Sequence, residues 1–246
     1  MSVIRFAIFG CGNIARVHAA ALKEIDGAVL VAVGDVNGDR ARDFGEIYGV
    51  RAVNTYEELV ADPEIDAICI CTPSGTHAEL AIKAVSHGKH VVLEKPMAIT
   101  VQDCEDIIAA CEATNAKLMV ISQYRTLPGI QRTRELIRTG ELGRLVICNV
   151  HMKYYRDEEY YRGSWRGTKL MDGGGALMNQ GIHGVDILQY LAGNIKNVKS
   201  FNKTLVHDIE VEDTSVSVVE FESGALGVIE ATTSVYPGFS RKIQLH

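Results

Sequence analysis

Residues 1–122 alternate between continuous apolar runs and segments with helical periodicity. Ile14, Val17, Ala21 and Ile25, for example, recur at the spacing of one helix face. The other predicted helices are 39–49, 55–63, 76–88 and 101–115. The predicted strands are 3–10, 28–35, 66–72, 90–96 and 116–122. Apolar strands between helices are typical of a parallel sheet covered on both faces, so we predict an α/β doubly wound domain at 1–122.

The pattern changes in residues 123–246. A helix is predicted over 128–143 and is followed by 145–155, in which apolar and polar residues alternate. This period of two indicates a sheet with one face on a core and the other open. A glycine-rich helix is predicted at 173–193, and further strands at 197–206, 214–235 and 240–246, with a hairpin turn at Ser223-Gly224. We therefore predict an α+β domain that begins at residue 123.

The last predicted strand, 240–246, stops without a turn or cap. A natural terminus there would expose a sheet edge. We expect the second domain to be incomplete at its C-terminus.

Composition and charge exclude several classes of protein. The 246 residues are 47% hydrophobic and 23% charged, a normal globular balance. The net charge of −6 argues against a nucleic-acid partner, and no apolar run approaches the roughly 20 residues that span a membrane. The six cysteines form no CxxC pair and no metal-ligand spacing, which predicts free thiols in the cytoplasm and no metal site.

The segment GCGNIA, residues 10–15, follows the first strand and opens the first helix. In this G-x-G-x-x-A pattern, Gly10 permits a tight turn, Gly12 lets the backbone approach a pyrophosphate, and Ala15 permits close helix packing. Asp35 ends the second strand, 20 residues beyond Ala15, where a carboxylate accepts hydrogen bonds from a ribose diol. This favours NAD over NADP, although an Arg at position 40 leaves NADP open.

The segment CTPSGTHAEL follows the strand at 66–72, and ligands bind at the carboxyl ends of parallel strands. Thr72 and Pro73 end the strand there, and Ser74 or Thr76 is a candidate cap of the next helix.

The segment VVLEKPMAIT, residues 91–100, carries Glu94, Lys95 and Pro96 at the end of a strand. Together with GCGNIA before it and GGGALMNQGIHGVD after it, the chain resembles the glucose–fructose oxidoreductase / inositol dehydrogenase (Gfo/Idh/MocA) family. The resemblance implies a Rossmann domain followed by a large, mostly antiparallel sheet. It also implies that the open face of this sheet forms a homodimer or homotetramer, and that the Lys95–Pro96 bond is cis. Lys95 would then face the nicotinamide and the substrate hydroxyl.

Further positions are carried over from the family. Gln123, Tyr124 and Arg125 follow the last Rossmann strand, and similar segments in the family approach nicotinamide and substrate. Trp165 and Arg166 resemble a family segment near the active site. Arg162 and Arg166 are candidates to bind a carboxylate or phosphate, although a solvated loop with a packing Trp explains this segment equally well.

The glycine-rich segment carries the candidate proton acceptor. Asn179 and His183 are four residues apart, on one face of the predicted helix, and Asp186 follows on the same side. A His has a suitable pKa to accept a hydroxyl proton near neutral pH, and a protonated Lys stabilises developing negative charge. Asp186 would orient the imidazole or hold the helix to its neighbours.

Asn179 departs from the inositol dehydrogenase branch, in which the residue four before the His is typically Asp. An amide positions a hydroxyl but takes up no proton, which leaves proton transfer to His183 and Lys95. The segment looks more like the nucleotide-sugar branch, such as UDP-N-acetylglucosaminuronate 3-dehydrogenase. Alternatives are a myo-inositol or free-sugar dehydrogenase and a non-catalytic NAD-binding regulator.

The sequence therefore predicts an NAD-dependent oxidoreductase of a sugar or nucleotide-sugar hydroxyl. The expected catalytic residues are Lys95, His183 and Asn179. The expected cofactor residues are Gly10, Gly12, Asn13, Ile14, Asp35, Thr72, Pro73, His77, Glu94, Lys95, Gln123, Trp165 and Arg166. The expected substrate residues are Lys95, Tyr124, Arg125, Arg166, Asn179 and His183.

Overall fold

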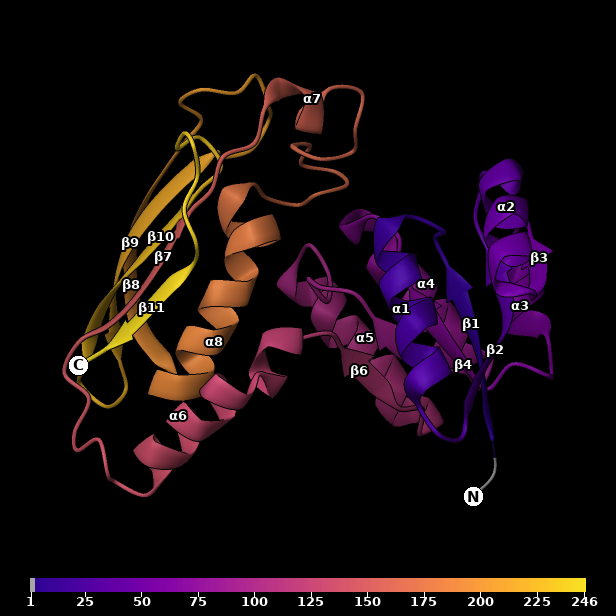
Figure 1. Cartoon of the computed structure of the whole chain (residues 1–246), viewed down its shortest axis with the longest axis horizontal. Helices are drawn as coiled ribbons and strands as arrows, with labels where there is room; N and C mark the ends of the chain where they lie inside the picture. The colour runs from indigo at the N-terminus through magenta and orange to yellow at the C-terminus, as the bar shows by residue number, and fades with distance from the viewer. Residues whose placement is uncertain (1–2) are drawn as a thin grey trace. The chain divides into compact units, whose positions relative to one another are not determined.

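The computed structural model describes residues 3–246 (Figure 1). The chain divides into two compact units, the first ending at Ile121 and the second beginning at Ser122. Each unit has its own sheet and its own apolar core. The two units are therefore described in turn.

The first unit contains a six-stranded parallel sheet in the order β3-β2-β1-β4-β5-β6. Its strands are β1 (Ile4–Phe9), β2 (Ala28–Gly34), β3 (Arg51–Val53), β4 (Ala67–Ile70), β5 (His90–Leu93) and β6 (Leu118–Val120). The order reverses between β1 and β4, which in doubly wound folds is the point where ligands bind at the carboxyl ends of strands. The predicted fold class of this unit is confirmed.

Helices and 3-10 turns connect these strands: α1 (Asn13–Glu24), α2 (Gly38–Tyr48), α3 (Tyr56–Ala61), η1 (Ser74–Thr76), α4 (His77–Ser86) and α5 (Val101–Thr114). Successive strand residues enter two different cores: Phe9 packs in one with Ile107 of α5, while Ile8 packs in the other with Phe44 of α2. The sheet is thus covered on both faces, as its continuous apolar strands predict. Strand β3 was not predicted, because only Val53 of its three residues is buried.

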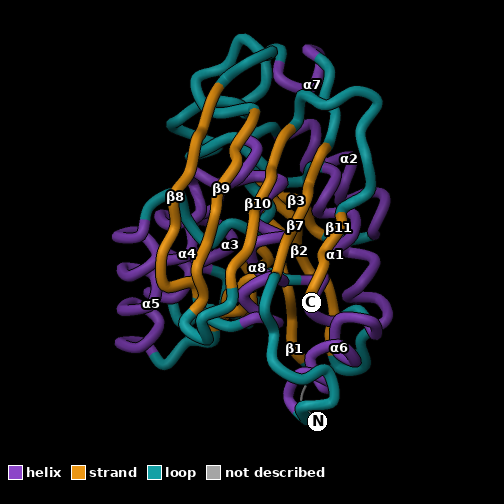
Figure 2. Tube along the Cα trace, turned by 90° about the vertical axis from the view of Figure 1, so that its left-hand side faces the viewer, coloured by secondary structure: helices purple, strands orange, loops and turns teal. Residues whose placement is uncertain are grey.

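The second unit contains a five-stranded sheet in the order β11-β7-β10-β9-β8. Its strands are β7 (Cys148–Lys153), β8 (Ile195–Lys203), β9 (Thr214–Phe221), β10 (Leu226–Thr232) and β11 (Lys242–Leu245). The β7–β10 pair is parallel, and the other three pairs are antiparallel. The expected mostly antiparallel sheet is confirmed, and Figure 2 looks onto its open face.

The remaining elements are η2 (Gln123–Thr126), α6 (Pro128–Arg138), α7 (Glu158–Tyr161), the π-helix η3 (Ala176–Gly181) and α8 (Ile182–Ala192). Helix α8 packs on one face of the sheet, over β7 (Figure 1). A Cβ at Gly184 would lie 2.4 Å from the Met152 sulfur, so a larger residue there would force the Met152 side chain to move. No helix within residues 3–246 has the length and apolar character to cross a membrane.

The predicted single helix at 173–193 is wrong in its first half, which is a π-helical turn. Glu212 holds this turn from outside the helix. Its carboxylate accepts the N–H groups of Gly175 and Leu177, each at 3.0 Å, and its carbonyl accepts that of Ala176 at 2.8 Å. Because Glu212 is so distant in sequence, its contacts do not affect the periodicity of apolar residues in 173–193, from which the helix was predicted.

Candidate active site

The glycine loop between β1 and α1 is shaped by the neighbouring strand β4. Gly10 has φ +93°, and a Cβ there would lie 2.7 Å from the Cys71 carbonyl oxygen. At Gly12, the N-cap of α1, a Cβ would have no atom of residues 3–246 within 4 Å, and no side chain in that range caps the helix. A small open space therefore lies at the N-terminus of a twelve-residue helix, where unpaired N–H groups favour an anion. The loop fits the pyrophosphate of a dinucleotide.

Asp35 lies directly after β2 and is only 4% exposed. Its Oδ2 accepts the N–H of Cys11 at 2.8 Å, and its Oδ1 accepts the N–H of Asn37 at 2.8 Å. The Arg40 guanidinium lies 3.5 Å from Oδ2. The two N–H bonds fix the carboxylate beside the glycine loop, where the sequence predicts the ribose of NAD.

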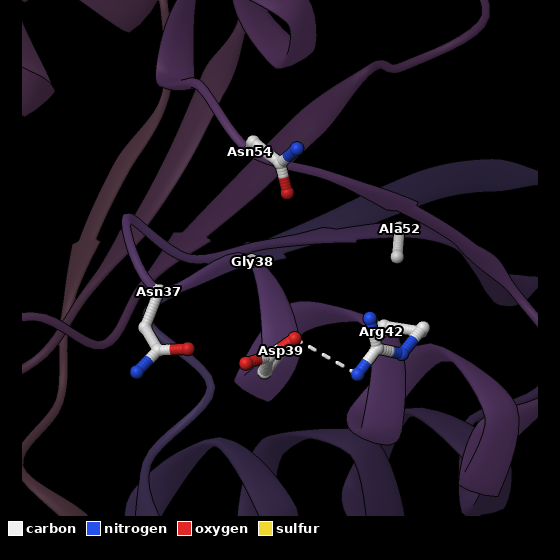
Figure 3. Close-up of a pocket in the computed structure, with 6 residues that line it drawn as sticks. All are labelled: Asn37, Gly38, Asp39, Arg42, Ala52 and Asn54. Atoms are coloured by element: carbon white, nitrogen blue, oxygen red, sulfur yellow. Dashed lines mark ion pairs between the residues drawn. The ribbon is translucent and has the colours of Figure 1, made fainter.

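A pocket of about 470 Å³ opens beside this carboxylate, at the start of α2 (Figure 3). Its lining is polar and includes the Asp39–Arg42 ion pair of 2.9 Å. Asn37 both lines the pocket and donates its N–H to Asp35. The pocket therefore extends the edge of the sheet at which the candidate cofactor residues lie.

Glu94 of the Glu94-Lys95-Pro96 segment supports the backbone at Lys95. Its Oε2 accepts the Lys95 N–H at 3.2 Å, and its Oε1 lies 2.9 Å from Nε2 of His18 on α1. Burial, the largest single influence, acts to raise the pKa of Glu94, but the contacts with His18 and Lys95 together hold that pKa below its usual value. The carboxylate thus stays ionised and ties α1 to the end of β5.

His77 supports the same segment from the other side. It is 1% exposed, its Nδ1 lies 2.7 Å from the Pro96 carbonyl oxygen, and its Nε2 lies 3.1 Å from that of Thr72. Burial lowers the pKa of His77, so at neutral pH the ring donates one hydrogen bond, which we assign to the shorter contact. The Lys95–Pro96 bond is cis, as expected, and Lys95 is half-buried.

In the second unit, a ring cluster surrounds His183 near the start of α8. The Tyr124 and His183 rings have centroids 4.9 Å apart and planes at 84°. The guanidinium of Arg241 lies over the Tyr124 ring at 4.0 Å. Tyr124, from η2, is thus held between a cation and the candidate proton acceptor.

Asp186 is used to hold α8, which is one of its two predicted roles. The Arg125 Nε donates to both Asp186 carboxylate oxygens, at 3.1 and 3.0 Å, and Nη2 adds a further bond. Arg125 also lies over Tyr190, at 5.0 Å from the ring centroid. The structure thus directs Arg125, expected at the substrate, toward α8.

Asn179 lies on the π turn beside a buried acid that the sequence reasoning missed. Its Nδ2 donates to Oδ1 of Asp172 at 2.7 Å, and Oδ2 of Asp172 accepts the Gly167 N–H at 2.9 Å. Asp172 is 2% exposed. A carboxylate therefore lies next to position 179 although residue 179 itself is an amide. The run of glycines after Asp172 indicates a close approach of the backbone to a neighbouring group. It gives no indication of the hydrogen bond between Asp172 and Asn179.

The segment before the glycines forms a stack of rings and cations. The Arg166 guanidinium lies 4.8 Å from the Tyr160 ring and 5.0 Å from the Trp165 ring. Tyr160 accepts a hydrogen bond from Gln180 at 3.0 Å, which joins the stack to the π turn. Arg162 instead pairs with two glutamates on α7 and is exposed, as a solvated loop predicts.

The predicted site residues thus fall into two groups. Gly10, Gly12, Asn13, Ile14, Asp35, Thr72, Pro73, His77, Glu94 and Lys95 belong to the first unit. Gln123, Tyr124, Arg125, Trp165, Arg166, Asn179 and His183 belong to the second. Sequence reasoning missed His18 and Arg241 because their contacts are distant in sequence, and it missed Asp172 because its bond to Asn179 depends on the shape of the π turn.

Both units match known family models. Residues 4–122 match the oxidoreductase family with an NAD-binding Rossmann fold, and residues 130–246 match the GFO/IDH/MocA C-terminal domain. Myo-inositol 2-dehydrogenase of Thermotoga maritima is 30% identical over 98% of the chain and 72% of its own length.

Two solved structures are similar over almost the whole chain. The WlbA dehydrogenase of Chromobacterium violaceum, in complex with NADH and UDP-GlcNAcA, is 36% identical with a TM-score of 0.94, over 99% of this chain and 72% of that one. The WlbA dehydrogenase of Bordetella pertussis, in complex with the same two molecules, is 35% identical with a TM-score of 0.95, over 99% and 74%. The chain therefore belongs to the Gfo/Idh/MocA family of NAD-binding oxidoreductases.

Proposed function

We propose that this chain is an NAD-dependent dehydrogenase of a nucleotide sugar, which it oxidises at a secondary hydroxyl. The observation that carries the substrate choice is Asn179, a neutral amide bonded to the buried Asp172 where inositol dehydrogenases typically place an acid. The similarity to two dehydrogenases crystallised with NADH and UDP-GlcNAcA supports the same choice. Asp35 and the open space at Gly12 support NAD as the cofactor.

NAD, when bound, takes the hydride that leaves the alcohol carbon. Lys95 donates a hydrogen bond to the hydroxyl oxygen and stabilises the negative charge that grows on it. His183 accepts the hydroxyl proton and releases it to water, so that the products are the ketone, NADH and one proton. Asn179 orients the hydroxyl, with its own amide fixed by Asp172. Glu94 and His77 hold the backbone on either side of Lys95.

Reduction of NAD, followed by its absorbance, tests this proposal on UDP-GlcNAcA, UDP-GlcNAc, myo-inositol and free hexoses. We expect turnover of UDP-sugars. Lys95→Met and His183→Asn should each lower kcat by roughly 10²–10⁴-fold, with NADH affinity within a few-fold of wild type. The matched control is Arg132→Gln, which removes an exposed charge paired with Glu135. Normal turnover by Lys95→Met would rule out the mechanism.

One alternative substrate class is favoured by a specific similarity. The Thermotoga maritima relative is named as a myo-inositol dehydrogenase. Turnover of myo-inositol with none of UDP-sugars would establish that alternative. NADH binding without turnover of any substrate would favour a non-catalytic regulator.

We also propose that the open face of the second sheet packs against another copy of the chain in the cytoplasm. Phe201 is 81% exposed and is paired in register with Val216, and Val218 is 55% exposed on the same face. Such a cluster of exposed apolar side chains is typical of an interface. Sedimentation of wild type and Phe201→Glu tests this, since a monomeric wild type would contradict it.

A further inference from the structure

Arg241 lies just before β11, on the side of the sheet that α8 covers. In β11, Ile243 and Leu245 pack into the core beneath α8, while Lys242 is exposed. The register of β11 with β7 ends at the pair of Lys242 with His151. Continued by one residue, it would place Arg241 on the face of Ile243 and opposite Met152. Met152 is the residue that contacts Gly184, the neighbour of His183.

The contacts of Arg241 place its charge at the His183 cluster. Its guanidinium lies 4.0 Å from the centroid of Tyr124, whose ring meets that of His183 at 4.9 Å. The face of an aromatic ring stabilises a cation, but only partly. A cation is therefore fixed one ring away from the candidate proton acceptor.

Arg241 has no acidic ion-pair partner among residues 3–246, and its buried Nε–H has no hydrogen-bond acceptor in that range. Buried donors are almost always satisfied, and an unpaired one costs free energy. Arg125, on the same η2 turn as Tyr124, is by contrast fully engaged by Asp186.

We propose that Arg241 recognises an oxyanion of the substrate, a carboxylate or a phosphate, and so selects anionic sugars over neutral ones. This inference rests on the proposed function, since it assigns a specificity residue to the same site. The guanidinium fork matches the geometry of both oxyanions and remains charged at any working pH. The stack on Tyr124 holds the fork in place before the ligand arrives, which reduces the entropy lost on binding. A neutral sugar would leave the charge uncompensated.

The experiment compares wild type, Arg241→Gln and Arg241→Lys on four substrates with NAD. UDP-GlcNAcA carries a diphosphate and a carboxylate, UDP-GlcNAc only the diphosphate, glucuronate only the carboxylate, and glucose neither. We expect Arg241→Gln to lower kcat/KM for UDP-GlcNAcA roughly 10²-fold, mainly through KM, and to change the value for glucose less than about three-fold. Arg241→Lys should restore part of the loss. Arg132→Gln, an exposed arginine on α6, is the matched control.

The pattern of losses identifies the oxyanion. If Arg241→Gln loses kcat/KM equally for both UDP-sugars, Arg241 recognises the diphosphate. If the loss is confined to UDP-GlcNAcA and glucuronate, Arg241 recognises the carboxylate. Equal losses for all four substrates, glucose included, would overturn the inference.

A wild-type protein that oxidises none of the four would refute the proposed function alone. The inference is then decided by calorimetric titration of UDP and of glucuronate into wild type and Arg241→Gln. If Arg241→Gln binds UDP or glucuronate more weakly than wild type does, the role of Arg241 is supported. If it binds both as tightly as wild type does, that role is ruled out.

Discussion

Position 179 shows what a single residue reveals in sequence and in structure. The sequence identifies Asn179 as a departure from the family pattern and places it near His183. It does not reveal Asp172, whose bond to Asn179 depends on the π turn and on the loop at Gly167. The same limit applies to His18 and Arg241. A residue that supports another segment, or that stacks on a ring, belongs to no sequence motif that would identify it.

The bond between Asn179 and Asp172 predicts the behaviour of Asn179→Asp. This change would restore the acid typical of inositol dehydrogenases, but it would place two carboxylates side by side. One of them would then have a pKa raised in the folded state above its value in the unfolded chain, so stability would fall as pH rises. We expect a loss of about 1–3 kcal/mol at pH 8 that is largely recovered only near pH 4, close to the carboxyl pKa of about 3.9 in the unfolded chain, measured by urea unfolding.

Asn179→Ala is the matched control for that experiment. It removes the hydrogen bond without adding a charge, so its loss of stability should change much less between the two pH values than that of Asn179→Asp. An Asn179→Asp protein as stable as wild type at pH 8 would show that Asp172 does not constrain this position.

At the scale of elements, the helix that carries His183 is positioned by residues outside it. Glu212 holds the π turn before α8, and Arg125 on η2 holds α8 through Asp186. Gly184 lets the helix lie directly on β7. Helical periodicity predicted that a helix forms over this segment. It could not predict the π turn, because that geometry depends on partners more than 30 residues away.

The Arg125–Asp186 pair should matter more for catalysis than for stability. Its side chains are 46% and 19% exposed, and ion pairs at such sites contribute at most about 1 kcal/mol. Asp186→Asn would nevertheless loosen α8 one turn from His183. A small displacement of a catalytic group costs much more in rate, so we expect kcat to fall roughly 10-fold or more, with the unfolding midpoint almost unchanged.

Two comparisons separate positioning from a general loss of structure. Glu135→Gln breaks an exposed pair on α6 and should leave kcat unchanged. Arg125→Gln combined with Asp186→Asn should be no slower than either single variant, because both remove the same contact. Additive losses would contradict a shared positioning role.

At the scale of the whole molecule, the two units differ in how far sequence predicts them. The first follows from its pattern of alternating strands and helices, whose parallel order obeys general rules of connection. The short strand β3 was not predicted, because only one of its three residues is buried and the segment shows no apolar pattern. In the second unit, the individual strands could be predicted, but the pairing of β7 with β10 joins residues about 80 apart, which no local pattern specifies.

NADH should stabilise the folded chain by binding at the glycine loop. Substitutions at Gly10 and Gly12 should distinguish an effect on folding from an effect on NADH binding. A Cβ at Gly12 meets no protein atom and the backbone there has φ −83°, so Gly12→Val should fold with nearly wild-type stability. Its side chain would fill the space expected for the pyrophosphate. A Cβ at Gly10 would meet the Cys71 carbonyl at 2.7 Å with φ +93°, so Gly10→Ala should be destabilised even without ligand.

Thermal unfolding with and without NADH measures both effects. At 100 times its dissociation constant, NADH should stabilise the wild type by about 2.7 kcal/mol and raise its melting temperature. Gly12→Val should melt close to wild type without NADH and gain almost nothing from it. Gly10→Ala should melt lower in both conditions. A Gly12→Val protein that NADH stabilises as strongly as wild type would show that the pyrophosphate does not occupy the space at the start of α1.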